Sequence, residues 1–218
     1  MLKLYFAPGA CSFVPHVALE VIKAATGADF ETTLVKFHKG EHTTPEYLAM
    51  NPNGQVPVLL VDGKPLTQIV AICEYLDRNY PQAALLPTDP WARSQALSML
   101  AWMNNSVHPT FTHIFRPEKF AAGDAAMAEL KRFNTIQFAQ HLERIQGHIT
   151  HANPYLFGDK ISFADIYTVV FWRWGGIAGI DPDTLPGYKA YVDKLALLPA
   201  VAAAIERERI VLHMFKKA

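Results

Sequence analysis

The period of the apolar residues changes once along the chain, close to Tyr80. Before Tyr80, short strand-like runs alternate with helical periodicity. After it, alanine-rich helical periodicity continues with almost no strand-like alternation. A proline-bearing stretch lies at the change. The sequence therefore predicts an α/β domain over residues 1–81, a linker over residues 82–90 and an all-α domain over residues 91–218.

The first domain has the pattern βαβ, then a helix, then ββα. The initial βαβ favours a parallel strand pair joined by a right-handed crossover. Asp62-Gly63 separates two further strand-like runs and is typical of a two-residue hairpin turn, which makes those strands antiparallel. A mixed four-stranded sheet is expected. The predicted strands are 2–6, 30–37, 56–61 and 64–66, and the predicted helices are 12–25, 45–50 and 69–80.

The second domain contains helical patterns only. Its most clearly marked helix start is Ser162, which can form a capping box with Asp165, while Ile161 and Ile166 can pack across that box. Pro109 falls inside a long helical pattern and predicts a bend there. The predicted helices are about 90–115, 124–152, 163–178, 182–197 and 199–209.

Composition excludes several classes of protein. The chain has 218 residues, half of them hydrophobic, and its 20 basic residues balance 20 acidic ones. No charge asymmetry indicates a nucleic acid or an anionic membrane as partner. Pro8-Gly9 interrupts the apolar start, and later apolar runs are shorter than the roughly 20 residues of a membrane span. Two cysteines fit a reducing compartment, so a cytoplasmic protein is expected. The nine histidines show no metal-ligand spacing, and no metal site is predicted.

Cys11 stands between a strand and the first helix, where backbone amides and the helix dipole stabilise an anion. The thiol can be partly thiolate there, or it can be an inert small residue. Ser12 offers a hydroxyl that can cap the helix or hydrogen-bond to a sulfur anion. A C-x-x-C dithiol is disfavoured because Val14 holds the second position, and Cys73 lies on an apolar helix face typical of the core.

At two further positions the residues alone leave two alternatives for the local structure. Val56-Pro57 begins a strand, and the proline is either an ordinary trans edge residue or a cis residue that turns the Val56 main chain toward a ligand. His108 precedes Pro109, and its imidazole either faces the domain boundary or belongs to an ordinary helical histidine.

Taken together, these motifs resemble the glutathione transferases over nearly the whole chain. The first domain resembles their thioredoxin-like domain and the second their helical domain. The string APGACSFVPH at residues 7–16 is similar to the hallmark of the bacterial beta class. Further likeness lies in NPNGQVPVL at 51–59, in LTQ at 66–68 followed by AICEYL at 71–76, and in the capping box at Ser162.

The resemblance implies a glutathione site. Glutathione would lie along the main chain at Gln55, Val56 and Pro57, as an added strand. Its sulfur would point at Cys11 and Ser12, with His108 polarising or deprotonating it, and Cys11 could form a mixed disulfide with it. Gln68 would bind the γ-glutamyl end and Lys39 the carboxylate of the tripeptide.

Two positions depart from the family pattern. Ile69 stands where a serine or glycine is usual, and its missing hydroxyl would weaken binding by about 0.5–1.5 kcal/mol. Pro109 stands where a lysine is common, which removes a local positive charge. A hydrophobic electrophile would bind between the domains against aromatic side chains, which are Phe111, Phe115, Trp172 and Trp174.

We therefore expect a cytoplasmic homodimeric transferase that adds the glutathione thiolate to a hydrophobic electrophile, with no metal, nucleic acid or membrane partner. Two alternatives are a glutathione-dependent thiol-disulfide reductase acting through Cys11 and a non-catalytic protein that binds glutathione or hydrophobic ligands. Replacement of Cys11 by alanine separates the first alternative from conjugation, and absence of glutathione binding favours a carrier.

Overall fold

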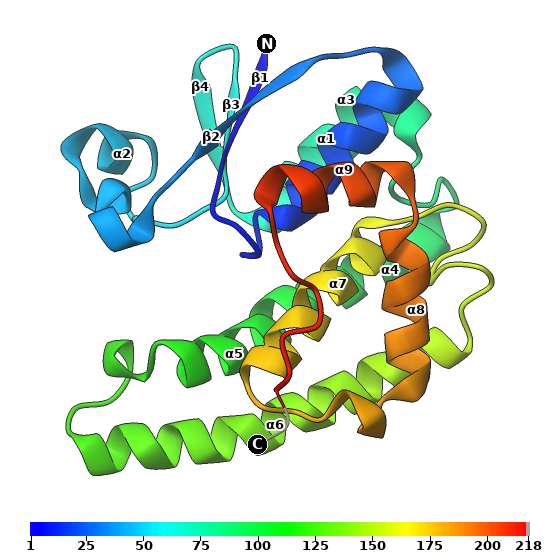
Figure 1. Ribbon diagram of the computed structural model, residues 1–218. Coiled ribbons are helices and arrows are strands. Elements are labelled where there is room, and N and C mark those ends of the chain that lie inside the picture. Colours follow the sequence, from blue (N-terminus) through cyan, green and yellow to red (C-terminus); the bar gives the residue numbers. More distant parts are fainter. Residues whose placement is uncertain (217–218) are drawn as a thin grey trace.

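The computed structural model describes residues 1–216 and contains a sheet domain followed by a helical domain (Figure 1). The sheet has four strands in the order β2-β1-β3-β4. β1 is parallel to β2 and antiparallel to β3, and Val61 pairs with Lys64 across the Asp62-Gly63 turn. The predicted mixed four-stranded sheet is confirmed. The strands are β1 (Leu2–Phe6), β2 (Phe30–Leu34), β3 (Val58–Val61) and β4 (Lys64–Thr67).

Helices cover both faces of this sheet. Alternate residues of β1, such as Leu4, are buried against α1 (Phe13–Thr26) and α3 (Ile69–Asn79) in the main core. The other face, at Val58, packs on Tyr47 of the short helix α2 (Pro45–Met50). The alternating pattern of the strands thus places α1, and Cys11 in the turn that precedes it, in the main core.

The second domain is entirely helical, as expected. Its central helix is α7, in which most side chains are buried, and it begins at the predicted capping box between Ser162 and Asp165. The helices are α4 (Pro90–Trp102), α5 (His108–Phe115), α6 (Asp124–Thr150), α7 (Phe163–Ile177), α8 (Pro186–Ala196) and α9 (Pro199–Glu208).

The expected helix over 90–115 contains a wider turn. Residues Met103–Val107 form a π-helical segment between α4 and α5. Pro109 follows at once, and because a proline nitrogen has no hydrogen, it cannot continue the regular hydrogen-bond pattern. The helix expected from 182 starts later, at Pro186, since Pro182–Thr184 is a separate 3-10 turn.

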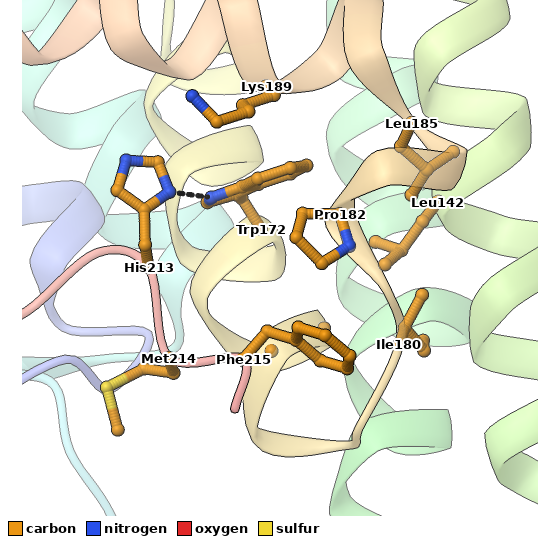
Figure 2. Close-up of a pocket in the computed structure, with 11 residues that line it drawn as sticks. Leu142, Trp172, Ile180, Pro182, Leu185, Lys189, His213, Met214 and Phe215 are labelled. Carbon is orange, nitrogen blue, oxygen red and sulfur yellow. Dashed lines mark hydrogen bonds between the residues drawn. The ribbon is translucent and has the colours of Figure 1, made fainter. Parts of the chain in front are cut away.

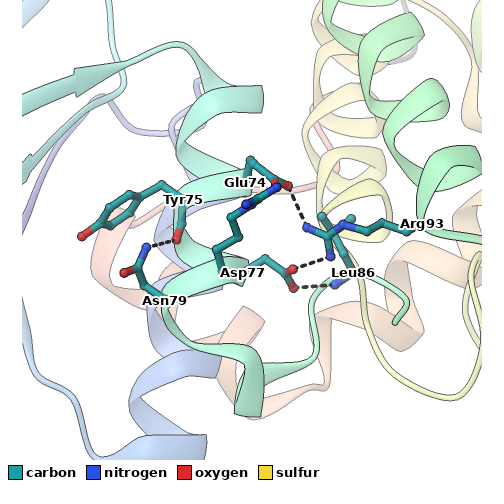
Figure 3. Close-up of polar contacts among 7 residues, drawn as sticks. Glu74, Tyr75, Asp77, Asn79, Leu86 and Arg93 are labelled. Carbon is teal, nitrogen blue, oxygen red and sulfur yellow. Dashed lines mark hydrogen bonds and ion pairs between the residues drawn. The ribbon is translucent and has the colours of Figure 1, made fainter. Parts of the chain in front are cut away.

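The two domains share one continuous core. α1 lies against both α7 and α9, so the crossover helix of the sheet domain contacts the last helix of the chain (Figure 1). An ion-pair cluster joins α3 to α4. Arg93 donates to Asp77 at 2.6 Å and to Glu74 at 2.7 Å, while Asp77 also accepts from the Leu86 amide (Figure 3). These contacts fix the second half of α3 against the start of α4. Among residues 1–216, no helix is long and apolar enough to cross a membrane.

Candidate functional site

A pocket lies where the turn after β1, the loop before β3, the start of α3 and the π-helical segment meet. It brings together residues that are far apart in the sequence, and the sequence analysis assigned all but two of them to one site. The lining residues are Cys11, Asn51, Gln55, Val56, Pro57, Gln68, Ile69, Asn104 and His108.

The loop before β3 is held by two side chains. The Gln55 carbonyl accepts hydrogen bonds from Asn51 Nδ2 at 2.7 Å and from the Tyr47 hydroxyl at 2.8 Å. The Val56-Pro57 peptide bond is cis, which is one of the two alternatives that the residues alone left open. The Val56 carbonyl accepts from the Cys11 thiol, with 3.5 Å between oxygen and Sγ. The main chain at Val56 and the thiol therefore share one wall of the pocket.

Cys11 lies on the pocket floor with 7% of its surface exposed. Burial raises the pKa of the Cys11 thiol to about 12, and the backbone hydrogen bonds at Cys11 and Ser12, which lower it, do not compensate. The expectation of a partial thiolate at neutral pH is thus corrected. Loss of hydration of the charged sulfur outweighs the favourable position at the helix start.

Ser12 does not line the pocket. Its hydroxyl donates to the Ala7 carbonyl at 3.3 Å and accepts from the Ala7 amide at 3.1 Å, and the residue is fully buried. It is the residue before α1, but its side chain makes no capping hydrogen bond. The structure therefore corrects the expectation that this hydroxyl caps the helix or contacts a sulfur anion. Both hydrogen bonds of the Ser12 hydroxyl close the turn from Ala7 to Ser12.

The same turn is fixed from the helical domain at Gly9. The Gly9 amide donates to Glu208 of α9 at 2.8 Å, and the Gly9 carbonyl accepts from the Trp174 indole of α7 at 2.9 Å. Glu208 also pairs with His16 Nδ1 at 2.8 Å, and both side chains are fully buried. Gly9 has a φ of +64°, a conformation that favours glycine. Residues from both domains thus position Cys11.

His108 reaches the pocket from the first residue of α5. Its Nδ1 lies 2.8 Å from the Tyr167 hydroxyl, and its ring packs edge-on against Trp174 with 4.9 Å between centroids. Burial lowers the pKa of His108 to about 4. The imidazole is therefore neutral at pH 7, and it is a hydrogen-bonding group of low basicity.

The four predicted aromatic residues separate into two groups. Phe111 stacks on Trp174 and on Phe115, with centroids 4.4 and 5.6 Å apart, so these rings form a row that leads away from His108. Phe115 ends the row with 60% of its surface exposed. Trp172 is not part of it. Its indole contacts His213 and Tyr188 on another side of α7, because residues two apart on a helix point in nearly opposite directions.

Of the residues predicted to bind the two ends of the tripeptide, those for the γ-glutamyl end line the pocket and the one for the carboxylate does not. Gln68 lines the pocket in the positive-φ region, at +71°, and Ile69 is buried beside it. Lys39 is exposed in the turn Phe37–Lys39 and is not among the lining residues. Sequence reasoning missed Asn51 and Asn104. Asn51 stands in the string NPNGQVPVL, which carried the family likeness without a role for Asn51, and nothing in the sequence marked Asn104. Within residues 1–216, no three metal-ligating side chains gather.

Comparisons with known proteins agree with this geometry. Residues 1–78 match the glutathione S-transferase N-terminal domain family, and residues 103–199 match the corresponding C-terminal domain family. Glutathione S-transferase GST-4.5 of Xanthomonas campestris is 32% identical over 95% of this chain and 98% of its own length.

Solved structures agree as well. A glutathione transferase homologue from Sulfitobacter with bound glutathione has a TM-score of 0.88 and 29% identity, covering 96% of this chain and 99% of its own. The bacterial beta class glutathione S-transferase of Sphingomonas chungbukensis has a TM-score of 0.82 and 33% identity over 96% of this chain and 100% of its own. The predicted fold and the predicted transferase class are confirmed, and the chain belongs to the glutathione S-transferase family.

Proposed function

We propose that the protein binds glutathione in the pocket at Cys11 and transfers its thiolate to a hydrophobic electrophile. One observation carries the proposal. The main chain at Val56, the Cys11 thiol and the neutral imidazole of His108 line the same small pocket. An extended tripeptide can pair with the main chain that leads into β3, and its central sulfur then lies near Cys11.

Different residues would contact different parts of glutathione. Gln55, Val56 and Pro57 supply main-chain recognition, and Gln68 supplies an amide for the γ-glutamyl end. Ile69 contributes its backbone at the start of α3 and no hydroxyl. Lys39, exposed in its turn, reaches the tripeptide carboxylate only after its side chain swings toward the pocket.

Reaction requires that glutathione lose its thiol proton to solvent and that the sulfur form a bond to carbon, while the leaving group departs with its bonding pair. With a pKa of about 4, His108 is too weakly basic to hold that proton at neutral pH. We assign it the polarising role, as a hydrogen-bonding partner of the sulfur. Cys11 is protonated at neutral pH, and its single S–H would turn from the Val56 carbonyl to donate a second hydrogen bond to the same sulfur.

The acceptor would bind along the aromatic row of Phe111, Phe115 and Trp174, which begins beside His108 and ends at the surface. Phe111 and Trp174 are each 5% exposed and would form the base of this acceptor site, whereas the ring of Phe115, 60% exposed, would contact the acceptor itself. Trp172, on a different side of α7, is left out of this assignment.

A second candidate function is thiol-disulfide exchange, favoured by the position of Cys11 in the pocket. The Cys11 thiolate would attack a glutathionylated substrate, take over the glutathione as a mixed disulfide and release the substrate thiol. A second glutathione would then release glutathione disulfide. The raised pKa of Cys11 opposes this route, because only the thiolate attacks.

The decisive experiment combines binding and turnover. Calorimetric titration with glutathione tests the site, and conjugation to an activated chloroarene tests the transfer. Cys11→Ala should retain conjugation and lose any reduction of mixed disulfides. His108→Ala should lower the conjugation rate, whereas His151→Ala, an exposed histidine at the end of α6, should not. Absence of glutathione binding with the fold intact would instead identify a carrier of hydrophobic ligands.

We further propose a homodimer located in the cytoplasm. α4 buries only Ala96 and Leu100 in the single chain, and Trp91 at its start is 72% exposed, so this helix offers an apolar contact surface. Two free cysteines, without a disulfide, suit a reducing compartment. Light scattering of the purified protein measures whether it is a dimer. Fractionation of the source cells measures whether it is located in the cytoplasm.

A further inference from the structure

A second cavity, of about 100 Å³, lies beside α7 away from Cys11. Trp172 lines it, whereas Trp174, two positions later, contacts Gly9 and His108 at the first pocket. Two positions on a helix correspond to a rotation of about 200°. The body of α7 therefore separates the two sites.

Two adjacent glycines of α7 let neighbouring segments approach the helix closely beside this cavity. A Cβ on Gly175 would lie 2.7 Å from Leu142 of α6, and a Cβ on Gly176 would lie 2.7 Å from the backbone nitrogen of Phe215. α6 and the C-terminal segment, residues 211–216, thus approach α7 where it has no side chains. Ile180 lies across the cavity from Trp172, and Phe215 closes it from the C-terminal segment (Figure 2).

The C-terminal segment is held in place by polar contacts. Arg173 Nε donates to the Val211 carbonyl at 3.0 Å. The Trp172 indole donates to His213 Nδ1 at 3.1 Å, as Figure 2 shows, and His213 Nε2 lies 3.0 Å from Asp193 of α8. The C-terminal segment thus forms an ordered wall of the cavity, held by hydrogen bonds to α7 and α8. Because it is not part of a helix, it is also the wall that can shift without disturbing the packing of a helix.

The same contacts make the cavity unfavourable for water. A buried water needs two to four polar partners. The indole donor of Trp172 and both ring nitrogens of His213 already have theirs, and the Lys189 ammonium, which also lines the cavity, donates to Asp193 at 2.8 Å. Most of the remaining lining is apolar, with Leu142, Ile180 and Phe215 among it. An apolar occupant would make dispersion contacts with this lining.

We propose that this cavity binds an uncharged single-ring aromatic molecule at a site separate from the catalytic pocket. An apolar cavity of about 150 Å³ in another protein takes up benzene. The cavity here approaches that size, and a small outward shift of the C-terminal segment supplies the rest. The ring would lie between Trp172 and Phe215 beside the glycine pair.

The test uses the full-length protein and toluene as the probe, with the indole N–H signals of the four tryptophans followed by NMR. Replacing each tryptophan singly by phenylalanine assigns the signals. Toluene should shift the Trp172 signal in a saturable way, and saturating glutathione should leave the midpoint unchanged within twofold. Trp174 reports the catalytic pocket, so the two signals separate the two sites.

Ile180→Phe fills the cavity and should weaken toluene binding at Trp172 at least tenfold. Leu197→Phe makes a comparable enlargement at an apolar residue that is 83% exposed, and it should bind toluene as the unaltered protein does. Neither residue belongs to the proposed catalytic site, so conjugation activity checks the folding of both variants. The proposal is overturned if toluene shifts only Trp174, if glutathione displaces it from Trp172, or if Ile180→Phe binds it undiminished.

Discussion

Glu208 accepts a hydrogen bond from the backbone amide of Gly9, which lies 199 positions earlier in the sequence and two residues before Cys11. The second carboxylate oxygen of Glu208 pairs with His16 on α1. A single buried carboxylate of the last helix therefore holds both the turn and the helix that flank the Cys11 thiol. Its removal leaves a buried amide and a buried imidazole without a partner.

Glu208→Gln should lower the free energy of unfolding by about 1–3 kcal/mol, because the neutral amide loses the charged hydrogen bond to His16 and keeps the size of the side chain. Urea unfolding measures this. Glu206→Gln, on the exposed surface of the same helix, is the matched control and should change stability by less than about 0.5 kcal/mol. Equal stabilities of the two variants would show that the Glu208 contact contributes nothing.

Gly9→Ala should destabilise the protein more than Gly27→Ala. Both glycines have positive φ, +64° and +75°, and an added methyl group costs about 1–2 kcal/mol for that reason alone. Only at Gly9 does the new Cβ meet another group, the Arg173 guanidinium at 2.6 Å, while Gly27 has no atom within 4 Å. Arg173 can withdraw only by breaking its bond to Val211.

Thermal and urea unfolding of both glycine variants give the comparison, and we expect about 1 kcal/mol more loss at Gly9. Adding Arg173→Ala to Gly9→Ala removes the collision and should make the Gly9 substitution less damaging than it is in the unaltered background. No such interaction between the two substitutions would refute the steric explanation.

Stability should fall between pH 6.5 and pH 4 because of His108. Its pKa is lowered by burial to about 4, whereas the unfolded chain has an ordinary value near 6.5. In that window the unfolded state binds a proton that the folded state does not, so acid favours unfolding. At pH 5 this proton uptake lowers the free energy of unfolding by about 2 kcal/mol.

Urea unfolding at pH 7.5 and pH 5.0 measures this effect. His108→Gln cannot titrate, so its stability should decline about 2 kcal/mol less over the interval than that of the unaltered protein. His151→Gln, at an exposed position, should decline as the unaltered protein does. If His108→Gln loses as much stability as the unaltered protein, the imidazole is not buried in its neutral form.

Cys11 should react slowly with iodoacetamide at neutral pH. Its pKa of about 12 leaves a thiolate fraction more than a hundredfold below that of a free cysteine at pH 7.5, and the rate should still rise between pH 8 and pH 10. Peptide-resolved mass spectrometry measures the rate at each cysteine. Cys73, which is fully buried in α3, is the internal control and should be slower still. A rate at Cys11 that levels off near pH 8 would contradict the raised pKa.

The elements of the fold were predictable because each carries a local signal. Alternation in β1, the Asp62-Gly63 turn and the Ser162 capping box act over a few residues, and all three occur as expected. The boundaries shifted where a proline or a tight turn intervened. The π-helical segment before His108 was missed, because a bend at Pro109 was the only consequence drawn from the missing amide hydrogen.

The chemistry of the site was less predictable because it depends on packing between distant segments. The position of Cys11 at a helix start indicates a thiolate, yet the covering of that position by the rest of the fold reverses the direction of its pKa shift. Ser12 was expected to cap α1 or contact a sulfur, and its hydroxyl is used within the turn itself. The separation of Trp172 from Trp174, by contrast, follows from helical geometry and could have been foreseen.

The contact between Gly9 and Glu208 also sets an order of events during synthesis. The β1 strand and α1 leave the ribosome early, but the turn between them lacks one of its two anchors until the ninth helix has emerged. A nascent chain can thus carry a nearly complete sheet domain and still have an unfinished thiol site. Cys11 is set in its final position only when almost the whole polypeptide has been made.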